Sequence, residues 1–374
     1  MTIPVTPPLT DAPAAPSERY YVASQRELIW RKFRRHRLAM VSLAVLAFLY
    51  VLALVSDFVT PYNVNTKFTG FLNTPPQVVR LFGDGGFRPY VQGYTRTSDP
   101  VTLAFVFKPD PQKRVPLRFF VRGEPYKLLG LFPTTIHLFG AGEEQVFLFG
   151  TDSLGRDVFS RTVSALKISL FVGLVGVALS FILGVVLGGV SGYFGGLTDL
   201  IVQRLIEFLL SIPTIPLWLA LSAALPPGWS SVAVFFGITI ILSLIGWSGI
   251  ARVVRGKFLE LREENYVTAA LLAGATPWWV ITRHLIPAFS SYLIVQVTLL
   301  IPSFILGETA LSFLGLGIQP PAVSLGTLLQ DAQNIRAVSL YPWLLLPALF
   351  VVAVVLAFNF VGDGLRDAAD PYKQ

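Results

Sequence analysis

Residues 208–251 contain no Asp, Glu, Lys or Arg, and this run of 44 residues constrains the fold more than any other feature. A helix needs about 20 apolar residues to cross about 30 Å of hydrocarbon, so the run is too long for one span. Its Pro226-Pro227-Gly228 triplet cannot continue a helix and predicts a turn between two spans. The chain is therefore expected to be an integral membrane protein.

Four further apolar stretches raise the number of predicted spans to six, which gives an all-α membrane fold. They cover residues 38–59, 168–190, 287–307 and 343–361. Only 14% of the residues are charged, whereas soluble domains carry about 25%. Basic residues at membrane edges explain the net charge of +7, so it is no argument for nucleic-acid binding. The chain lacks cysteine and its three histidines are scattered, so we expect no metal site.

Charge placement predicts the topology. The N-terminal tail, residues 1–37, ends in the basic cluster RKFRRHR, which is expected to stay in the cytoplasm. Six spans then return the C-terminus to the cytoplasm and place the loop at 252–287 there. The first span is too long and too far from the N-terminus for a signal peptide.

Residues 60–149 form the one segment that reads as a small separate domain on the outer side. The runs TLAFVFK and PLRFFV predict short antiparallel strands, and PDPQKR and RGEP predict turns. This β-rich insert could be a passive cap on the outer face. It could also contact an extracytoplasmic binding protein or a partner permease.

Residues 264–287 form a polar, small-residue island between two apolar spans. Gly274 is a good helix stop, and Thr276-Pro277 is a good start for a second helix. Spacing places four small residues on one helix face: Ala269, Ala270, Ala273 and Gly274. The segment predicts a surface against which a partner could pack, or else a plain connector between two spans.

This island resembles the EAA loop in permease subunits of binding-protein-dependent ABC importers. Ala269, Ala270, Gly274 and Pro287 match the family pattern, and Ile286 stands where the family has Leu. The chain departs from the pattern at Thr268, which replaces Glu, and at His284, which replaces Ile. The resemblance implies coupling to ATPase subunits through eight residues: Glu264, Tyr266, Thr268, Ala269, Ala270, Ala273, Gly274 and Pro287.

Three more motifs in residues 150–371 are similar to the dipeptide/oligopeptide/nickel permease family, in its second-permease branch. They are GTDSLGRD, ETALSFLGLGIQPP and GDGLRDAADP. The resemblance implies a type I permease core with five of the six spans and the coupling loop.

Four charged residues in these motifs are candidate partner contacts: Asp152, Arg156, Asp157 and Glu308. Asp152 and Asp157 could suggest paired catalytic carboxylates, but five positions apart they are poorly aligned on a helix. The alternative is an interfacial helix that Thr151 or Asp152 caps and that Arg156 and Asp157 tie to its neighbours. Glu308 is either a functional group at membrane depth or an interfacial cap of the ALSFLG helix.

The function class follows from what the chain contains and from the resemblance. No phosphate-binding loop occurs: Gly256-Lys257 is followed by Phe258, and Ala251 stands where the first glycine belongs. The chain is therefore expected to be no enzyme and to need no cofactor, with ATP hydrolysed by partner subunits.

The resemblance implies a heterodimer with a homologous permease, two ABC ATPase subunits, an extracytoplasmic binding protein and a place in the bacterial cytoplasmic (inner) membrane. Small peptides are the expected substrate, with opines, oligosaccharides or nickel complexes as alternatives. A secondary transporter or channel would need ionisable residues in mid-span or paired broken helices, and 208–251 and 284–307 contain no Asp, Glu, Lys or Arg. A membrane-anchored enzyme would need a catalytic constellation in the insert, and the sequence shows none.

Overall fold

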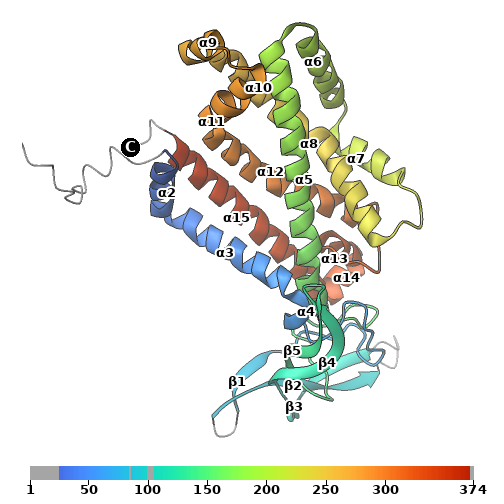
Figure 1. The fold of residues 1–374 in the computed structure, drawn as a ribbon. Helices are drawn as coiled ribbons and strands as arrows, with labels where there is room; N and C mark the ends of the chain where they lie inside the picture. The colour runs from blue at the N-terminus through green and yellow to red at the C-terminus, as the bar shows by residue number, and fades with distance from the viewer. Residues whose placement is uncertain (1–24, 84–85, 99–104, 371–374) are drawn as a thin grey trace, which may run out of the picture.

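The computed structural model describes residues 25–83, 86–98 and 105–370 (Figure 1). The helices are α2 Gln25–Arg35, α3 Arg37–Leu54, α4 Ser56–Val59, α5 Val158–Phe194, α6 Gly196–Ser211, α7 Thr214–Ala223, α8 Ser231–Leu261, α9 Asn265–Leu272, α10 Pro277–Val280, α11 Ile286–Ala288, α12 Ser290–Phe313, α13 Leu325–Asp331, α14 Ile335–Leu340 and α15 Leu346–Ala369. The strands are β1 Val79–Gly83, β2 Gly86–Ser98, β3 Phe105–Pro116, β4 Arg118–Leu128 and β5 Phe132–Gly140. Residues 1–24 of the predicted N-terminal tail and residue 371 of the predicted core lie outside the described ranges.

Five helical segments in the described ranges are long and apolar enough to cross a membrane. They are α3, α5, α8, α12 and the segment Pro342–Ala369, and the pair α6–α7 makes a sixth if it counts as one span. The connection between α7 and α8 contains the predicted Pro-Pro-Gly turn at 226–228. The multi-span helical prediction is therefore confirmed.

The third predicted span is interrupted, which was not predicted from the sequence. The α6–α7 pair bends by 88° at Ile212-Pro213, so it is a broken span or a re-entrant loop. Ile212 has extended backbone angles, as expected for a residue before proline, and Pro213 has no N–H to continue the helix. The helix also begins before the charge-free run does, because α6 starts at Gly196.

The longest helix, α5, packs closely on α8 along a row of glycines. Gly184 faces Ile250, and Gly192 faces Arg255. A Cβ placed on Gly188 would lie 2.4 Å from the carbonyl oxygen of Ala251. Small residues let helix backbones approach in this way inside membranes. The main apolar core joins α5 to α3, α12 and α15.

The insert contains two antiparallel sheets, of order β1-β2-β3 and β4-β5, which confirms the β-rich prediction (Figure 1). The two predicted turns inside it were wrong. PDPQKR lies within β3, opposite an irregularity between Gln92 and Tyr94 of β2, and RGEP lies within β4 at an irregularity between Arg122 and Tyr126. Extra residues in one strand form such bulges and bend it without ending it. Residues 102–104 of the first predicted strand lie outside the described ranges.

The insert and the α9–α10 segment lie at opposite ends of the molecule (Figure 1). The helix α2 lies beside the C-terminal end of α15. The insert and the α9–α10 segment are therefore separated by the full length of the helical bundle, and each could contact a different partner.

Candidate functional site

The first candidate surface is formed by α9, α10 and the turn between them. Gly274 has φ +88°, a left-handed conformation that glycine adopts without a side-chain penalty. Thr276 Oγ1 accepts a hydrogen bond from the Trp279 N–H at 3.3 Å, and Pro277 stands at the first helical position. The predicted helix–glycine turn–helix is therefore confirmed.

One buried side chain anchors α9 to the long helix before it. Val267 is fully buried in an apolar cluster with Val254 and Phe258 of α8 and with Val280 and Leu285 beyond the turn. Ala270 packs against the same cluster. Because α9 is seated on α8, a displacement of α9 would be transmitted to a membrane-spanning helix.

The outer face of this segment is apolar, and large side chains dominate it. Leu272 is 85% exposed and Trp278 is 69% exposed, and Leu271 and Trp279 are also exposed. Large apolar side chains at such exposure outside the spans mark contact sites for proteins or membranes. Sequence reasoning did not single out Leu272 or Trp278, although bulky residues beside a predicted turn could have been a signal.

The predicted coupling residues do not all reach this face. Ala269, Ala273 and Gly274 are exposed, whereas Ala270 is half-buried against the core. Thr268 is exposed. The four small residues therefore do not form one uniform surface.

The remaining predicted coupling residues frame the segment. Glu264 is the N-cap residue of α9, with its carbonyl accepting from the Val267 and Thr268 N–H groups. The Tyr266 ring lies 5.9 Å from the His284 ring, between centroids. Pro287 follows a π-helical turn at Ile281–Leu285 and lies in α11, at the entry to the next span. A π turn of this kind commonly accompanies a functional segment in a helix.

A second candidate site lies at the other end of the bundle, where GTDSLGRD meets α13. Asp152 accepts hydrogen bonds from the Leu154 and Arg156 N–H groups at 2.8 and 2.9 Å, and from Arg156 Nε at 2.7 Å. It also binds Arg161 of α5. Asp331 of α13 accepts from Arg161 Nη1 at 2.9 Å and from Arg156 Nη2 at 3.3 Å.

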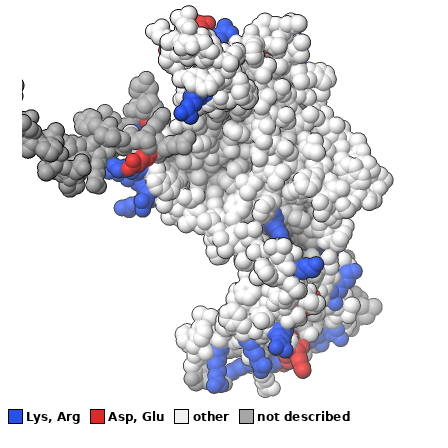
Figure 2. Space-filling view, in the orientation of Figure 1, with Lys and Arg blue, Asp and Glu red and all other residues white. Residues whose placement is uncertain are grey.

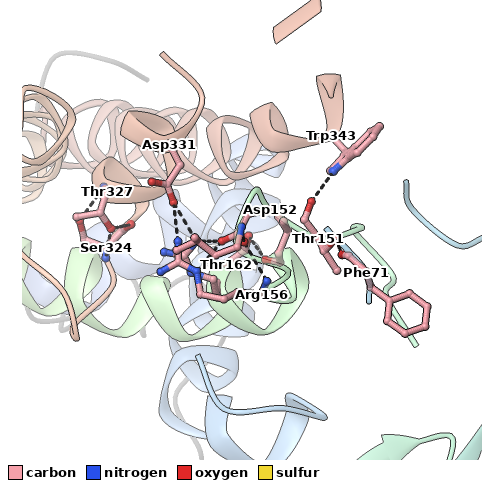
Figure 3. Close-up of polar contacts among 12 residues, drawn as sticks. Phe71, Thr151, Asp152, Arg156, Thr162, Ser324, Thr327, Asp331 and Trp343 are labelled. Atoms are coloured by element: carbon pink, nitrogen blue, oxygen red, sulfur yellow. Dashed lines mark hydrogen bonds and ion pairs between the residues drawn. The ribbon is translucent and has the colours of Figure 1, made fainter. Parts of the chain in front are cut away.

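We call these four residues the Asp152 network (Figure 3). Asp152 and Arg161 are almost entirely buried, and Asp331 is the half-exposed member. Buried charges of this kind need partners, since desolvation of an unpaired ion costs several kcal/mol. The network therefore ties the start of α5 to α13.

The prediction of an interfacial helix capped by Thr151 or Asp152 was wrong. Gly150 and Gly155 have φ +74° and +73°, and Thr151 pairs with Asp157 in an isolated bridge. A Cβ on either glycine would meet a backbone carbonyl at 2.5 Å or less. The segment is consequently a tight turn, and α5 begins only at Val158.

Thr151 joins this turn to neighbouring segments. Its Oγ1 donates to the Phe71 carbonyl and accepts from the Thr74 N–H at 2.8 Å. The indole of Trp343 donates to the Thr151 carbonyl at 3.0 Å (Figure 3). These contacts fix the turn between the insert and the last span. The insert is therefore held to the core by side-chain contacts as well as by its two chain connections.

Asp157 is the N-cap of α5, and it has no part in a carboxylate pair with Asp152. Its Oδ2 accepts from the Ser160 N–H at 2.8 Å and from Ser160 Oγ at 2.6 Å. Burial raises the pKa of Asp157 to about 7, although the Ser160 hydrogen bonds act to lower it. Oδ1 has no hydrogen-bond partner among the described residues, which suits a carboxyl group that is protonated near neutral pH.

The raised pKa of Asp157 predicts a pH dependence of stability. The folded state binds a proton that the unfolded chain releases above its ordinary value of 3.8, so this stabilisation is complete below about pH 4. It is lost as pH rises through about 7, by at most about 1.4 kcal/mol per pH unit. Thermal unfolding of Asp157→Asn, measured from pH 4 to 8, should be flatter than that of the unmodified chain. Parallel curves would contradict this.

Glu308 is not an interfacial cap, because α12 continues past it to Phe313. Its side chain is fully buried and accepts from Ser169 Oγ at 3.0 Å and Ser312 Oγ at 2.7 Å. The same two hydroxyls accept from the Leu325 and Ile318 N–H groups. Glu308 therefore organises a buried polar cluster that fixes residues 318–325 to α5 and α12.

Comparison with known families agrees with this architecture. Residues 184–373 match the model of the binding-protein-dependent transport system inner membrane component. Residues 24–76 match that of the N-terminal TM domain of oligopeptide transport permease C. The first match contains the α9–α10 segment and Asp331, and the second contains α2, α3 and α4.

Individual relatives match over most of the chain. A dipeptide transport system permease protein of Lactococcus lactis subsp. cremoris is 33% identical over 349 residues, which cover 91% of this chain and 89% of that protein. Its Bacillus subtilis counterpart is 33% identical over 343 residues, covering 91% and 84%. An oligopeptide transport system permease protein of Haemophilus influenzae is 41% identical over 229 residues, covering 61% and 71%.

Proposed function

This chain belongs to the family of binding-protein-dependent transport system inner membrane components, and we propose that it forms half of the translocation path of an ATP-driven peptide importer. It is a multi-pass membrane subunit without enzymatic activity. One observation carries the proposal. An exposed apolar helix–turn–helix is seated on a spanning helix, at the end of the bundle opposite the insert.

ATP hydrolysis is assigned to two ABC ATPase subunits, one of which docks on the α9–α10 surface of this chain. Exposed Leu272 and Trp278 supply the apolar contact, and Val267 carries the motion into α8. A partner changes an equilibrium between two conformations only if its contacts differ between them. Nucleotide-driven displacement of α9 is therefore the step that reorients the spans.

The complete importer needs two more subunits in this proposal. A homologous permease completes the path, since this chain supplies half of it. An extracytoplasmic binding protein delivers the substrate to the end of the bundle that carries the insert. This arrangement places the insert and the coupling surface on opposite sides of the membrane.

The expected substrates are small peptides, because the relatives are named as dipeptide and oligopeptide transport permeases. The test is uptake of a labelled dipeptide by proteoliposomes that contain both permeases, the ATPases and the binding protein. Uptake should require ATP and should be competed by other dipeptides. Competition by opines, oligosaccharides or nickel complexes instead would identify that class as the substrate. Uptake driven by an ion gradient without ATP would contradict the proposal of an ATP-driven importer.

Topology is tested by single cysteines, because the native chain contains none. Cysteines at 110 in the insert and 330 in α13 should react with an impermeant reagent in intact cells. Cysteines at 265 in α9, and at 372 beyond the described residues, should react only after permeabilisation. Labelling of 265 in intact cells would contradict cytoplasmic termini and a cytoplasmic coupling surface.

A further inference from the structure

The helix α2 presents a basic face immediately before the first span. It ends at Arg35, and α3 begins at Arg37 after a break at His36. Five basic residues fall within seven positions there: Arg31, Lys32, Arg34, Arg35 and Arg37. They lie within about two turns of the first apolar residue of α3, so they are close to the membrane surface.

The opposite side of α2 is fixed to the bundle. Phe33 is fully buried, and it packs beside Gly364 of α15 and Ala39 of α3. Trp30 stacks on Phe33 with 5.8 Å between ring centroids, yet about half of its surface is exposed. The helix is thus amphipathic and held in place, with an exposed aromatic residue beside its basic face.

The basic side chains surround a hollow of about 270 Å³, whose described lining is Arg31, Lys32, Arg34 and Arg35. Arg31 pairs with Glu27, and Lys32 Nζ donates to the Asp370 carbonyl. Arg34, Arg35 and Arg37 have no carboxylate partner within the described ranges. Like charges gathered around one hollow repel one another, so a bound anion would stabilise this arrangement. Blue side chains gather below α2 at this edge in Figure 2.

We propose that α2 and the first turn of α3 form a binding site for the phosphate group of an anionic phospholipid. The position of α2 beside the first span favours a lipid over a soluble anion as the ligand. A basic amphipathic helix next to a span lies at the membrane surface, where anionic headgroups are concentrated. The exposed Trp30 suits that interface, because an indole prefers the headgroup level.

The site has a structural consequence that does not depend on the transported substrate. Phe33 joins α2 to the end of α15, so a headgroup held by Arg34 and Arg35 fixes the first and last spans together. These two helices are distant in sequence and adjacent in space (Figure 1). A lipid at this position would therefore stabilise the packing of the first span against the last.

The test is lipid binding to the full-length chain in its purified complex, measured by native mass spectrometry. The probes are phosphatidylglycerol, zwitterionic phosphatidylcholine and inorganic pyrophosphate. The variant Arg34→Gln/Arg35→Gln should bind phosphatidylglycerol roughly thirtyfold more weakly, because each basic residue contributes about 1 kcal/mol near an anionic surface. Arg34→Lys/Arg35→Lys should bind within a few-fold of the unmodified chain, since it keeps both charges.

The matched control is Arg118→Gln/Arg122→Gln, which removes the same charge from two exposed positions in the insert. It should leave phosphatidylglycerol binding unchanged. Equal binding by the control and by the Arg34→Gln/Arg35→Gln chain would overturn the site. So would equal affinity for phosphatidylcholine, or full displacement by pyrophosphate, which would identify a soluble anion as the ligand.

A measurement on the unmodified chain keeps the proposal testable if the Gln variant does not fold. Phosphatidylglycerol binding should weaken steadily between about 0.05 and 0.5 M salt, because exposed charges are screened as the Debye length falls. Binding that is independent of salt would overturn an electrostatic headgroup site.

Discussion

Replacing Gly274 by Asp is expected to reduce ATP-dependent uptake roughly tenfold or more while the subunit remains folded and inserted. Gly274 has φ +88°, and a side chain in this conformation costs about 1–2 kcal/mol. Among the described residues, apart from the two chain neighbours, no heavy atom lies within 4 Å of a Cβ placed there, so the substitution causes no internal clash. Its effect would instead be strain in the turn and a carboxylate on the apolar surface between α9 and α10.

Two control variants separate these causes. Gly274→Asn keeps the left-handed turn more readily and adds no charge, so it should retain more uptake than Gly274→Asp. Gly228→Asp changes another open left-handed glycine, φ +89°, which precedes α8 and so lies at the end of that helix opposite α9. It should leave coupling intact. Normal uptake and substrate-stimulated ATPase activity in a well-folded Gly274→Asp complex would contradict the coupling proposal.

The membrane spans were predictable from the sequence because charge is excluded from hydrocarbon. Whether a given proline breaks its helix was not predictable. Pro213 separates α6 from α7 with an 88° bend, whereas Pro302 lies inside α12, which continues around it. Both prolines remove a backbone donor and stand in apolar runs. Whether a helix survives depends on neighbours that satisfy the freed carbonyl, and those neighbours come from distant segments.

In the insert, the ends of the strands were likewise not predictable from local sequence. Alternating apolar residues predict its antiparallel strands, but the sequence also predicts turns at PDPQKR and RGEP. In the structure both are bulged parts of longer strands. Pro and Gly favour both features locally, and pairing with the neighbouring strand decides between them. β4 ends at Leu128, and the turn that follows it contains Leu129 and Gly130, which both have positive φ.

In the candidate sites, features set by local sequence were predictable, and contacts between distant segments were not. The turn at Gly274 and its helix start at Thr276-Pro277 follow from local chemistry, and the structure confirms them. Asp152 and Arg156 were singled out from their motif, but their partners Arg161 and Asp331 were missed. Asp331 is 170 residues beyond Arg161, so only the packing of α13 on the start of α5 brings the two together.

Asp152→Ala is expected to destabilise the folded subunit by about 3–5 kcal/mol, because it leaves two buried guanidinium groups short of their main partner. Arg161 is almost fully buried, and Arg156 is mostly buried. Asp331 cannot replace Asp152, since its side chain is 39% exposed and its attraction is screened by solvent. Unfolding of the purified complex by heat or denaturant measures the loss.

The matched control is Glu207→Ala, which breaks an exposed ion pair with Arg204 and should cost no more than about 1 kcal/mol. A second comparison isolates charge from packing. Asp152→Asn combined with Arg161→Gln removes one charge of each sign, so it should be less destabilising than Asp152→Ala alone. If Asp152→Ala costs no more than Glu207→Ala, the network contributes little to stability. Its four charged residues would then have to be explained by contacts with a partner subunit at the N-terminal end of α5.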